Sequence, residues 1–253
     1  MPYLYETHMH TCFSSRCGKS TGKEHARFYR DQGYTGIIIT DHFFGGNTSV
    51  PRDLPWEERI DLFWRGYEDA LEEGLKIGLD VFFGLEQNFQ GDEYLVYGLT
   101  KEYMKAHPEL ERWTRREMLS EVHSQGGAVI QAHPFRIRDY MDAIRLGDIF
   151  ADGVEAANAG NDQLDDARAF RYARSKNLVM TAGSDNHHSP APLLFGVELE
   201  TRLTSILDYA DIIRSRDKIG LRVPESRFVM PDIHLDERHR AFRLDENENT
   251  VPC

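Results

Sequence analysis

Short runs of apolar or alternating residues recur along the chain and predict strands. They cover residues 3–10, 35–40, 80–89, 93–99, 126–133, 152–158, 178–185 and 195–200. Such runs, bounded by turn-forming residues, are typical of strands. Stretches with apolar residues at helical spacing lie between many of them, at 21–33, 56–78, 115–126 and 165–177. Strands that alternate with helices predict an α/β fold with a mostly parallel sheet or barrel.

Five of the predicted strands carry metal-binding residue types at or near their carboxyl ends. These residues are His8, His10, His42, Glu86, His133, Asp185 and His187. In a parallel barrel the carboxyl ends of the strands meet on one face, where the βα loops build active sites. Residues two apart in a strand point the same way, so His8 and His10 can bind one ion together.

The donor types indicate which ions such a site would take. Imidazole and carboxylate groups together suit zinc, iron or manganese. Seven donors exceed the needs of one tetrahedral ion, and a carboxylate such as Glu86 can bridge two ions about 3.5–4 Å apart. The sequence therefore predicts a centre with more than one divalent metal ion (Zn, Mn or Fe).

Length, charge and cysteine content narrow the class of protein. The 253 residues suffice for one barrel domain, which we expect over 1–230, followed by a charged C-terminal tail over 231–253. No apolar run reaches the roughly 18 residues of a membrane span. Three cysteines are an odd number and predict a reducing, cytoplasmic location rather than a disulfide framework.

The net charge of −12 argues against wide, nonspecific binding of long nucleic acids, which relies on basic surface. It does not exclude a small phosphorylated substrate, because bound metal ions can reverse the local field. The sequence leaves the oligomeric state open.

Five motifs occur in order over roughly residues 4–190: "ETHMHT", "TDHF", "GLE", "AHPFR" and "GSDNHH". This series resembles the PHP family, the polymerase and histidinol phosphatase domain. The resemblance implies a distorted (β/α)7 TIM-like barrel with its metal site at the carboxyl ends of the strands. It also implies a two- or three-metal centre that hydrolyses phosphate esters.

The resemblance assigns the donors to three metal positions. It implies His8, His10 and Asp185 at the first, Glu86 as the bridge to the second, His133 at the second, and His42 and His187 at the third. Two family positions do not match. Ser15 and Arg16 stand where an Asp or His is usual, and Tyr94 stands at the position of a further His. Water, substrate phosphate or Cys17 could fill these gaps, or the centre could hold fewer ions.

The expected reaction is an in-line attack on phosphorus by a hydroxide that bridges two metal ions. Glu86, Asp185 and His187 are the candidate catalytic residues. Arg136, directly after "HPF", could bind phosphate through its planar guanidinium, or could form a surface salt bridge.

Two further residues are candidates for substrate binding. Arg16 could add positive charge near the mouth of the site, or could be a solvated surface charge. Asn158, at another strand end, could bind substrate, or could cap the following turn.

The leading functional prediction is a phosphomonoesterase that acts on a small metabolite, with histidinol phosphate as one possibility. A nuclease or phosphodiesterase that acts on nucleotide ends is one alternative. A non-catalytic metal-binding module is another, and the two unmatched positions motivate it.

Overall fold

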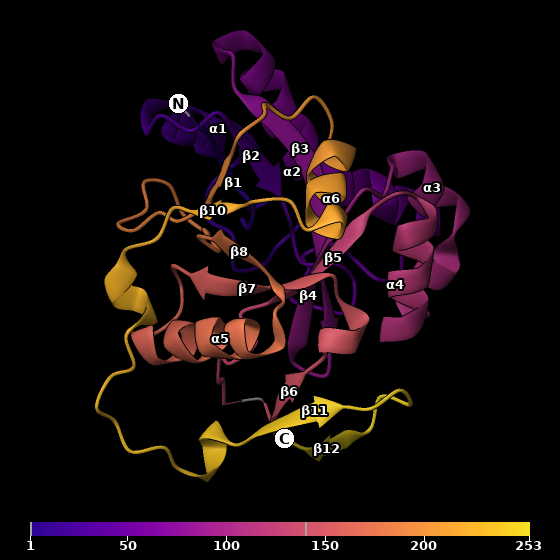
Figure 1. Cartoon of the computed structure of the whole chain (residues 1–253). Helices are drawn as coiled ribbons and strands as arrows, with labels where there is room; N and C mark the ends of the chain where they lie inside the picture. Colours follow the sequence, from indigo (N-terminus) through magenta and orange to yellow (C-terminus); the bar gives the residue numbers. More distant parts are fainter. Residues whose placement is uncertain (1, 140) are drawn as a thin grey trace.

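Nine strands form one sheet that curls into a nearly closed barrel in the computed structural model, which describes residues 2–139 and 141–253 (Figure 1). Along the sheet the order is β10 (Gly220–Leu221), β9 (Val197–Leu199), β1 (Tyr3–Glu6), β2 (Gly36–Ile39), β3 (Asp80–Phe89), β4 (Asp92–Tyr97), β5 (Ala128–Ala132), β7 (Gly153–Asn158) and β8 (Val179–Gly183). Just beyond β1 and β8, Met9 forms a parallel bridge with Asn186, which brings the two sides of the curl together.

Four of the eight neighbouring strand pairs in this sheet run parallel, and β9 runs antiparallel to both β1 and β10. β1, β2 and β3 pair in parallel, as do β5, β7 and β8, whereas β4 runs antiparallel to both β3 and β5. The predicted α/β fold with a TIM-like barrel is confirmed. The count of seven strand–helix units is not confirmed, because a two-residue turn and no helix joins β3 to β4.

Six α-helices and four short 3₁₀ helices connect the strands in the described ranges. They are α1 (Gly22–Asp31), α2 (Trp56–Ile77), α3 (Lys101–Ala106), α4 (Arg115–Ser124), α5 (Gln163–Lys176), α6 (Ile206–Ser215), η1 (Pro108–Arg112), η2 (Asp148–Phe150), η3 (Glu225–Phe228) and η4 (Glu237–His239). The four predicted helices correspond to α1, α2, α4 and α5. The sequence reading missed α3 and α6, although Ser205 begins α6 with a capping box to Asp208.

The turn between β3 and β4 fixes which side chains of this hairpin share a face. Gln90 and Gly91 have φ values of 56° and 101°. Two residues with positive φ between paired strands form a type I′ turn, whose twist matches that of the strands. In the resulting register Asn88 lies opposite Glu93. Because side chains alternate along a strand, Glu86, Asn88 and Glu93 lie on one face of the hairpin.

The C-terminal residues contribute to a second, three-stranded sheet. β11 (Ala241–Leu244) pairs in parallel with β6 (Ile144–Leu146) and antiparallel with β12 (Thr250–Pro252). In Figure 1 this sheet lies below α5, and Ile144 and Leu146 pack with Ala169 of that helix. The segment predicted as a charged tail thus contains two strands, and the domain boundary at residue 230 stays a prediction.

Within residues 2–139 and 141–253, no helix combines the length and the apolar character that a membrane crossing requires.

Helix α2 packs closely against the loops that follow β1 and β2. Thr11 donates hydrogen bonds from its backbone N–H and its hydroxyl to Asp41, both at 2.7 Å. A Cβ atom on Gly66 of α2 would lie 2.2 Å from Thr11 Oγ1 and 2.6 Å from Asp41 Oδ2. The absence of a side chain at Gly66 therefore lets the helix backbone approach this pair.

Gly66→Ala is expected to lower the free energy of unfolding by about 1–3 kcal/mol, because the added methyl group overpacks this contact. Helix propensity alone would favour Ala by about 1 kcal/mol, so the sign of the change is informative. Urea unfolding of the metal-free protein measures it. Arg65→Ala, on the exposed side of the same helix, is the control and should change the value by less than about 0.5 kcal/mol. A stabilised Gly66→Ala variant would contradict this account of the packing.

Candidate metal centre

The seven predicted ligands converge at the carboxyl ends of the barrel strands, together with one glutamate that the sequence reading missed. Four groups of three residues each bring one donor atom per residue within 4.8 Å of one another. They are His8–His10–Asp185, His8–Glu86–His133, His10–His42–His187 and His42–Glu86–Glu93. We call these eight residues the donor cluster.

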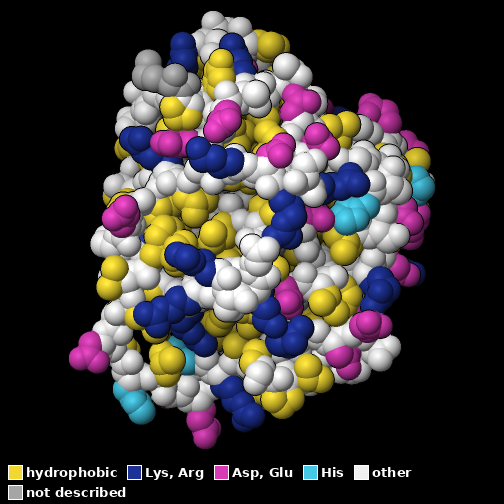
Figure 2. Space-filling view, viewed as in Figure 1, with side chains coloured by type: hydrophobic (Ala, Val, Ile, Leu, Met, Phe, Trp, Pro, Cys, Tyr) yellow, Lys and Arg dark blue, Asp and Glu magenta, His cyan; other side chains and the backbone are white. Residues whose placement is uncertain are grey.

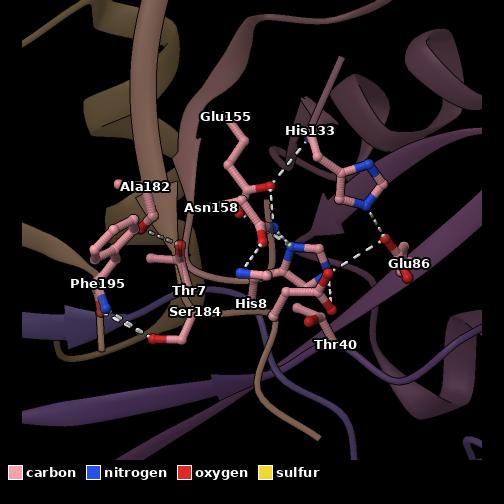
Figure 3. A network of polar contacts seen from close by, with 12 residues as sticks. Thr7, His8, Thr40, Glu86, His133, Glu155, Asn158, Ala182, Ser184 and Phe195 are labelled. Carbon is pink, nitrogen blue, oxygen red and sulfur yellow. Dashed lines mark hydrogen bonds and ion pairs between the residues drawn. The ribbon is translucent and has the colours of Figure 1, made fainter. Parts of the chain in front are cut away.

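The His8 ring is held between two glutamates (Figure 3). Its Nδ1 lies 3.0 Å from Glu155 Oε1, and its Nε2 lies 3.2 Å from both Glu86 Oε1 and His10 Nε2. A carboxylate that accepts the Nδ1 proton leaves the Nε2 lone pair directed into the cluster, which is how proteins orient metal-binding histidines.

Glu155 connects three parts of the site but was not predicted. Its Oε2 accepts hydrogen bonds from the backbone N–H of His133 at 3.1 Å and from Asn158 Nδ2 at 2.8 Å. The side chain is fully buried in β7. The available signal was an acidic residue inside the otherwise apolar strand "GVEAAN", because a buried carboxylate requires partners.

Two of the predicted ligands have an unusual backbone conformation. The φ values of His133 and Asp185 are 28° and 52°. Residues other than glycine rarely adopt this left-handed region, and such strain concentrates at functional sites. His133 directly follows β5, and Asp185 lies two residues beyond the end of β8, so the conformation turns their side chains into the site.

Two buried polar atoms lie together without forming a hydrogen bond. His42 Nδ1 and Glu86 Oε2 are 2.6 Å apart, yet neither has a partner with hydrogen-bond geometry. Buried polar atoms nearly always have a hydrogen-bond partner, and an atom without one points to a bound ion or water. Nitrogen and oxygen donors that converge in this way fit a divalent cation.

The surrounding charges set the ionisation of the donors. Burial alone would raise the pKa of Asp185, but Arg136 and His8 outweigh it and hold that pKa well below its usual range. Burial is likewise outweighed at Glu86, where His42 and His8 hold the pKa well below its ordinary value. Burial and the imidazoles of His42 and His187 lower the pKa of His10. Burial would lower the pKa of His8 and His42, but the neighbouring carboxylates outweigh it and raise both. Because ionised carboxylates and neutral imidazoles bind metal ions, a cation would displace a proton from these two rings.

A cavity of about 690 Å³ opens beside the cluster, and Arg136 and His187 are among its lining residues. The Arg136 guanidinium is buried and donates to Asp185 Oδ2 at 2.6 Å and to Asn158 Oδ1 at 2.7 Å. Its Nε–H donates to Asn161 Oδ1 at 2.7 Å. The alternative prediction for Arg136 was a surface salt bridge. Arg136 does form a salt bridge, with Asp185, but it is buried.

The other two predicted substrate-binding residues lie elsewhere. Asn158 is fully buried behind Arg136, where Glu155, Gly160 and Arg136 contact its side-chain amide. Arg16 is exposed, and its Nε–H donates to the carbonyl of Thr48 at 2.7 Å. The described residues that line the cavity include Arg136 but neither Asn158 nor Arg16.

The structure also shows what occupies the unmatched positions. Ser15 Oγ donates to Asp41 Oδ1 at 2.6 Å and accepts from the backbone N–H of His42 at 3.0 Å. Tyr94 is buried on the opposite face of the hairpin, and Glu93 stands beside His42 and Glu86 instead. The two-residue turn after Phe89 could have identified Glu93, because it fixes the register.

Cys17 lies next to the donor cluster. Burial raises its pKa, but hydrogen bonds with His187 and His42 outweigh this effect and lower the pKa to about 6. The thiol is therefore near two imidazoles of the third predicted metal position.

Comparisons with known proteins show similarity at the level of the fold. The sequence matches no protein-family model and no curated protein. A two-domain protein from Bacteroides vulgatus, with a domain predicted to be a PHP-like metal-dependent phosphoesterase, shares 21% identity at a TM-score of 0.60. That alignment covers 85% of this chain and 64% of the other.

Two further structures are similar over nearly their whole length. A protein from Bifidobacterium adolescentis, predicted to be a metal-dependent phosphoesterase, shares 17% identity at a TM-score of 0.52, over 84% of this chain and 98% of the other. An amidohydrolase from Chromobacterium violaceum shares 12% identity at a TM-score of 0.52, over 87% and 99%. These similarities confirm the PHP-like barrel fold that the motifs predicted.

Replacing Glu155 with Gln is expected to weaken Mn²⁺ binding by about 10–100-fold, because His8 loses the carboxylate that orients its ring. Calorimetric titration of metal-free protein measures the affinity. Glu73→Gln is the matched control, because Glu73 is also buried but pairs with Arg27 outside the cluster. Wild-type affinity in the Glu155 variant would show that this contact does not orient a ligand.

Proposed function

We propose that this protein is a metal-dependent hydrolase of phosphate esters, acting as a phosphomonoesterase on a small metabolite. One observation carries the proposal: the donor groups overlap. Glu86 Oε1 lies 3.2 Å from both His8 and His133, whereas its Oε2 lies 2.6 Å from His42. A carboxylate whose two oxygens face different sets of donors is suited to bridging two cations. The PHP-like fold of the similar structures supports the same reading.

The donor cluster provides positions for at least two divalent cations. His8, His10 and Asp185 would hold one, and Glu86 would connect it to a second near His42 and His133. Bound at these positions, the cations would supply a water of lowered pKa as nucleophile and would neutralise charge on the phosphoryl group. We propose Glu86, Asp185 and His187 as the residues closest to this chemistry.

Arg136 has the geometry to bind a phosphoryl group. A guanidinium carries five N–H donors. Asn161, Asp185 and Asn158 accept from three different nitrogens of Arg136, which leaves one N–H on each terminal nitrogen for a ligand in the cavity. Guanidinium groups bind phosphate oxygens through such pairs of parallel donors.

His187 can act at the cavity through its second ring nitrogen. Its Nδ1–H donates to the carbonyl oxygen of Asp185 at 2.7 Å, which places the proton of the neutral ring on Nδ1 and the lone pair on Nε2. That atom can bind a cation or take up a proton.

The size and charge of the molecule favour a small substrate. A cavity of about 690 Å³ lies in the usual range for small-molecule sites. The net charge is −12, and the face shown in Figure 2 carries both basic and acidic side chains. A long duplex requires a continuous basic surface. None of the three similar structures is described as a histidinol phosphatase, so we propose the ester class without naming a metabolite.

Metal-loaded wild-type protein is expected to hydrolyse a generic phosphomonoester, and His8→Ala should reduce the rate by at least about 100-fold, because a ligand is lost. The assay is phosphate release with added Mn²⁺ or Zn²⁺. His107→Ala, outside the donor cluster, is the control. A dinucleotide and an amide substrate, tested in parallel, separate phosphodiesterase and amidohydrolase activity. Unaltered hydrolysis by His8→Ala, or bound metal without hydrolysis of any phosphoester, would refute the proposal.

In Arg136→Met, the pH at which acidification abolishes Mn²⁺ binding is expected to be higher than in the wild type by about one unit. Arg136 holds the pKa of Asp185 well below its usual range. Asp185 is ionised above its pKa and loses its charge as the pH falls through it. Removing the guanidinium raises that pKa, so protonation competes with the cation at a higher pH. Affinity measured from acid to neutral pH tests this. Arg145→Met removes a buried guanidinium outside the cluster and should leave the profile in place.

A further inference from the structure

Glu93 is a buried carboxylate that neither the predicted ligand set nor the proposed reaction uses. It is 8% exposed. Its Oε2 lies 3.5 Å from His133 Nε2, and its Oε1 lies 3.8 Å from His42 Nδ1. Among the described residues, these two imidazoles are its ion-pair partners, and neither is close enough for a strong hydrogen bond.

The position of Glu93 places two carboxylates together in a buried site. Donor atoms of Glu93, Glu86 and His42 all lie within 4.8 Å of one another. Like charges at this separation repel strongly away from water, and no lysine or arginine in the described ranges forms an ion pair with either glutamate. A cation between the carboxylates would remove the repulsion.

Two further donor atoms point into the same space. Glu86 Oε2 and His42 Nδ1 lack hydrogen-bond partners, and water cannot readily supply them because Glu86 is only 1% exposed and His42 only 9%. Asn88 Nδ2 donates to Glu93 Oε1 at 3.0 Å. This contact holds the Glu93 carboxylate in place and leaves Oε2 directed at His133.

We propose that Glu93 is a ligand of the second cation. Its carboxylate makes this position prefer an ion that favours oxygen ligands, such as Mn²⁺, over Zn²⁺. The inference rests on the proposed metal centre and deepens it. His42, Glu86, Glu93 and His133 would supply two imidazoles and two carboxylates. The His10–His42–His187 group offers imidazoles only. Carboxylate donors suit Mn²⁺ and Mg²⁺, whereas imidazoles suit Zn²⁺.

Thermal unfolding of Glu93→Gln tests the ligand role without any activity assay. Gln has the shape of Glu but no charge, so the metal-free variant should melt at the same or a higher temperature than the wild type. Saturating Mn²⁺ should stabilise the wild type more than the variant, because stabilisation by a bound ligand grows with the logarithm of its affinity. The expected result is therefore a larger Mn²⁺-induced increase in melting temperature for the wild type than for the variant. An equal Mn²⁺-induced increase in both proteins would overturn the proposal.

Metal titration tests the preference. Glu93→Gln should lower the affinity for the second equivalent of Mn²⁺ by at least about 100-fold. This loss exceeds the usual effect of a group that contacts a ligand but not the metal ion. Glu93→His should restore a second equivalent but favour Zn²⁺ over Mn²⁺ by at least about 10-fold more than the wild type does.

Asp92→Asn is the matched control. Asp92 precedes Glu93 in β4 but lies on the other face, where it pairs with Arg115 at 2.7 Å. This variant should keep the wild-type stoichiometry and preference.

The outcomes separate the two proposals. Two Mn²⁺ equivalents with unchanged affinity in Glu93→Gln would remove Glu93 from the ligand set and leave the metal centre standing. A wild-type protein that takes up no divalent cation would refute the metal centre itself.

Discussion

The burial of the Glu86 carboxylate is the constraint on which the rest of the site depends. An ionised carboxylate removed from water is unstable unless opposite charge or hydrogen-bond donors surround it. Glu86 is 1% exposed, and the rings of His8, His133 and His42 approach its two oxygens. Because these imidazoles come from three different strand ends, the barrel can satisfy the carboxylate only when it is closed. The same closure creates the positions for cations.

A layer of polar contacts behind the cluster holds the donors in place. Glu155 orients His8 and the backbone at His133, and Arg136 contacts Asp185. Close packing limits movement further, because a Cβ atom on Gly183 would lie 2.5 Å from that of His8. A site supported in this way keeps its geometry before any ligand binds, which is the condition for tight metal binding and for catalysis.

The two positions that depart from the PHP motifs have different structural consequences. Ser15 supplies no carboxylate, but its hydroxyl lies 3.3 Å from His10 Nδ1 and connects Asp41 to the backbone of His42. The other departure leaves the donor count intact, because Glu93 enters the cluster from the neighbouring register position. The donor cluster thus contains five imidazoles and three carboxylates.

The sequence by itself determined the strand and helix pattern and the seven predicted donors at the strand ends. These features are local: a strand alternates with period two, and capping residues such as Thr21 and Glu24 act within one helical turn. The short turn after Phe89 is a local signal for an antiparallel β4 with Glu93 facing the site, whereas the tertiary structure alone decided that Asn158 lies behind Arg136. It also decided that the C-terminal residues pair with β6. These outcomes depend on the register between strands and on closure of the sheet, which join residues far apart in the chain and leave no periodic signal in it.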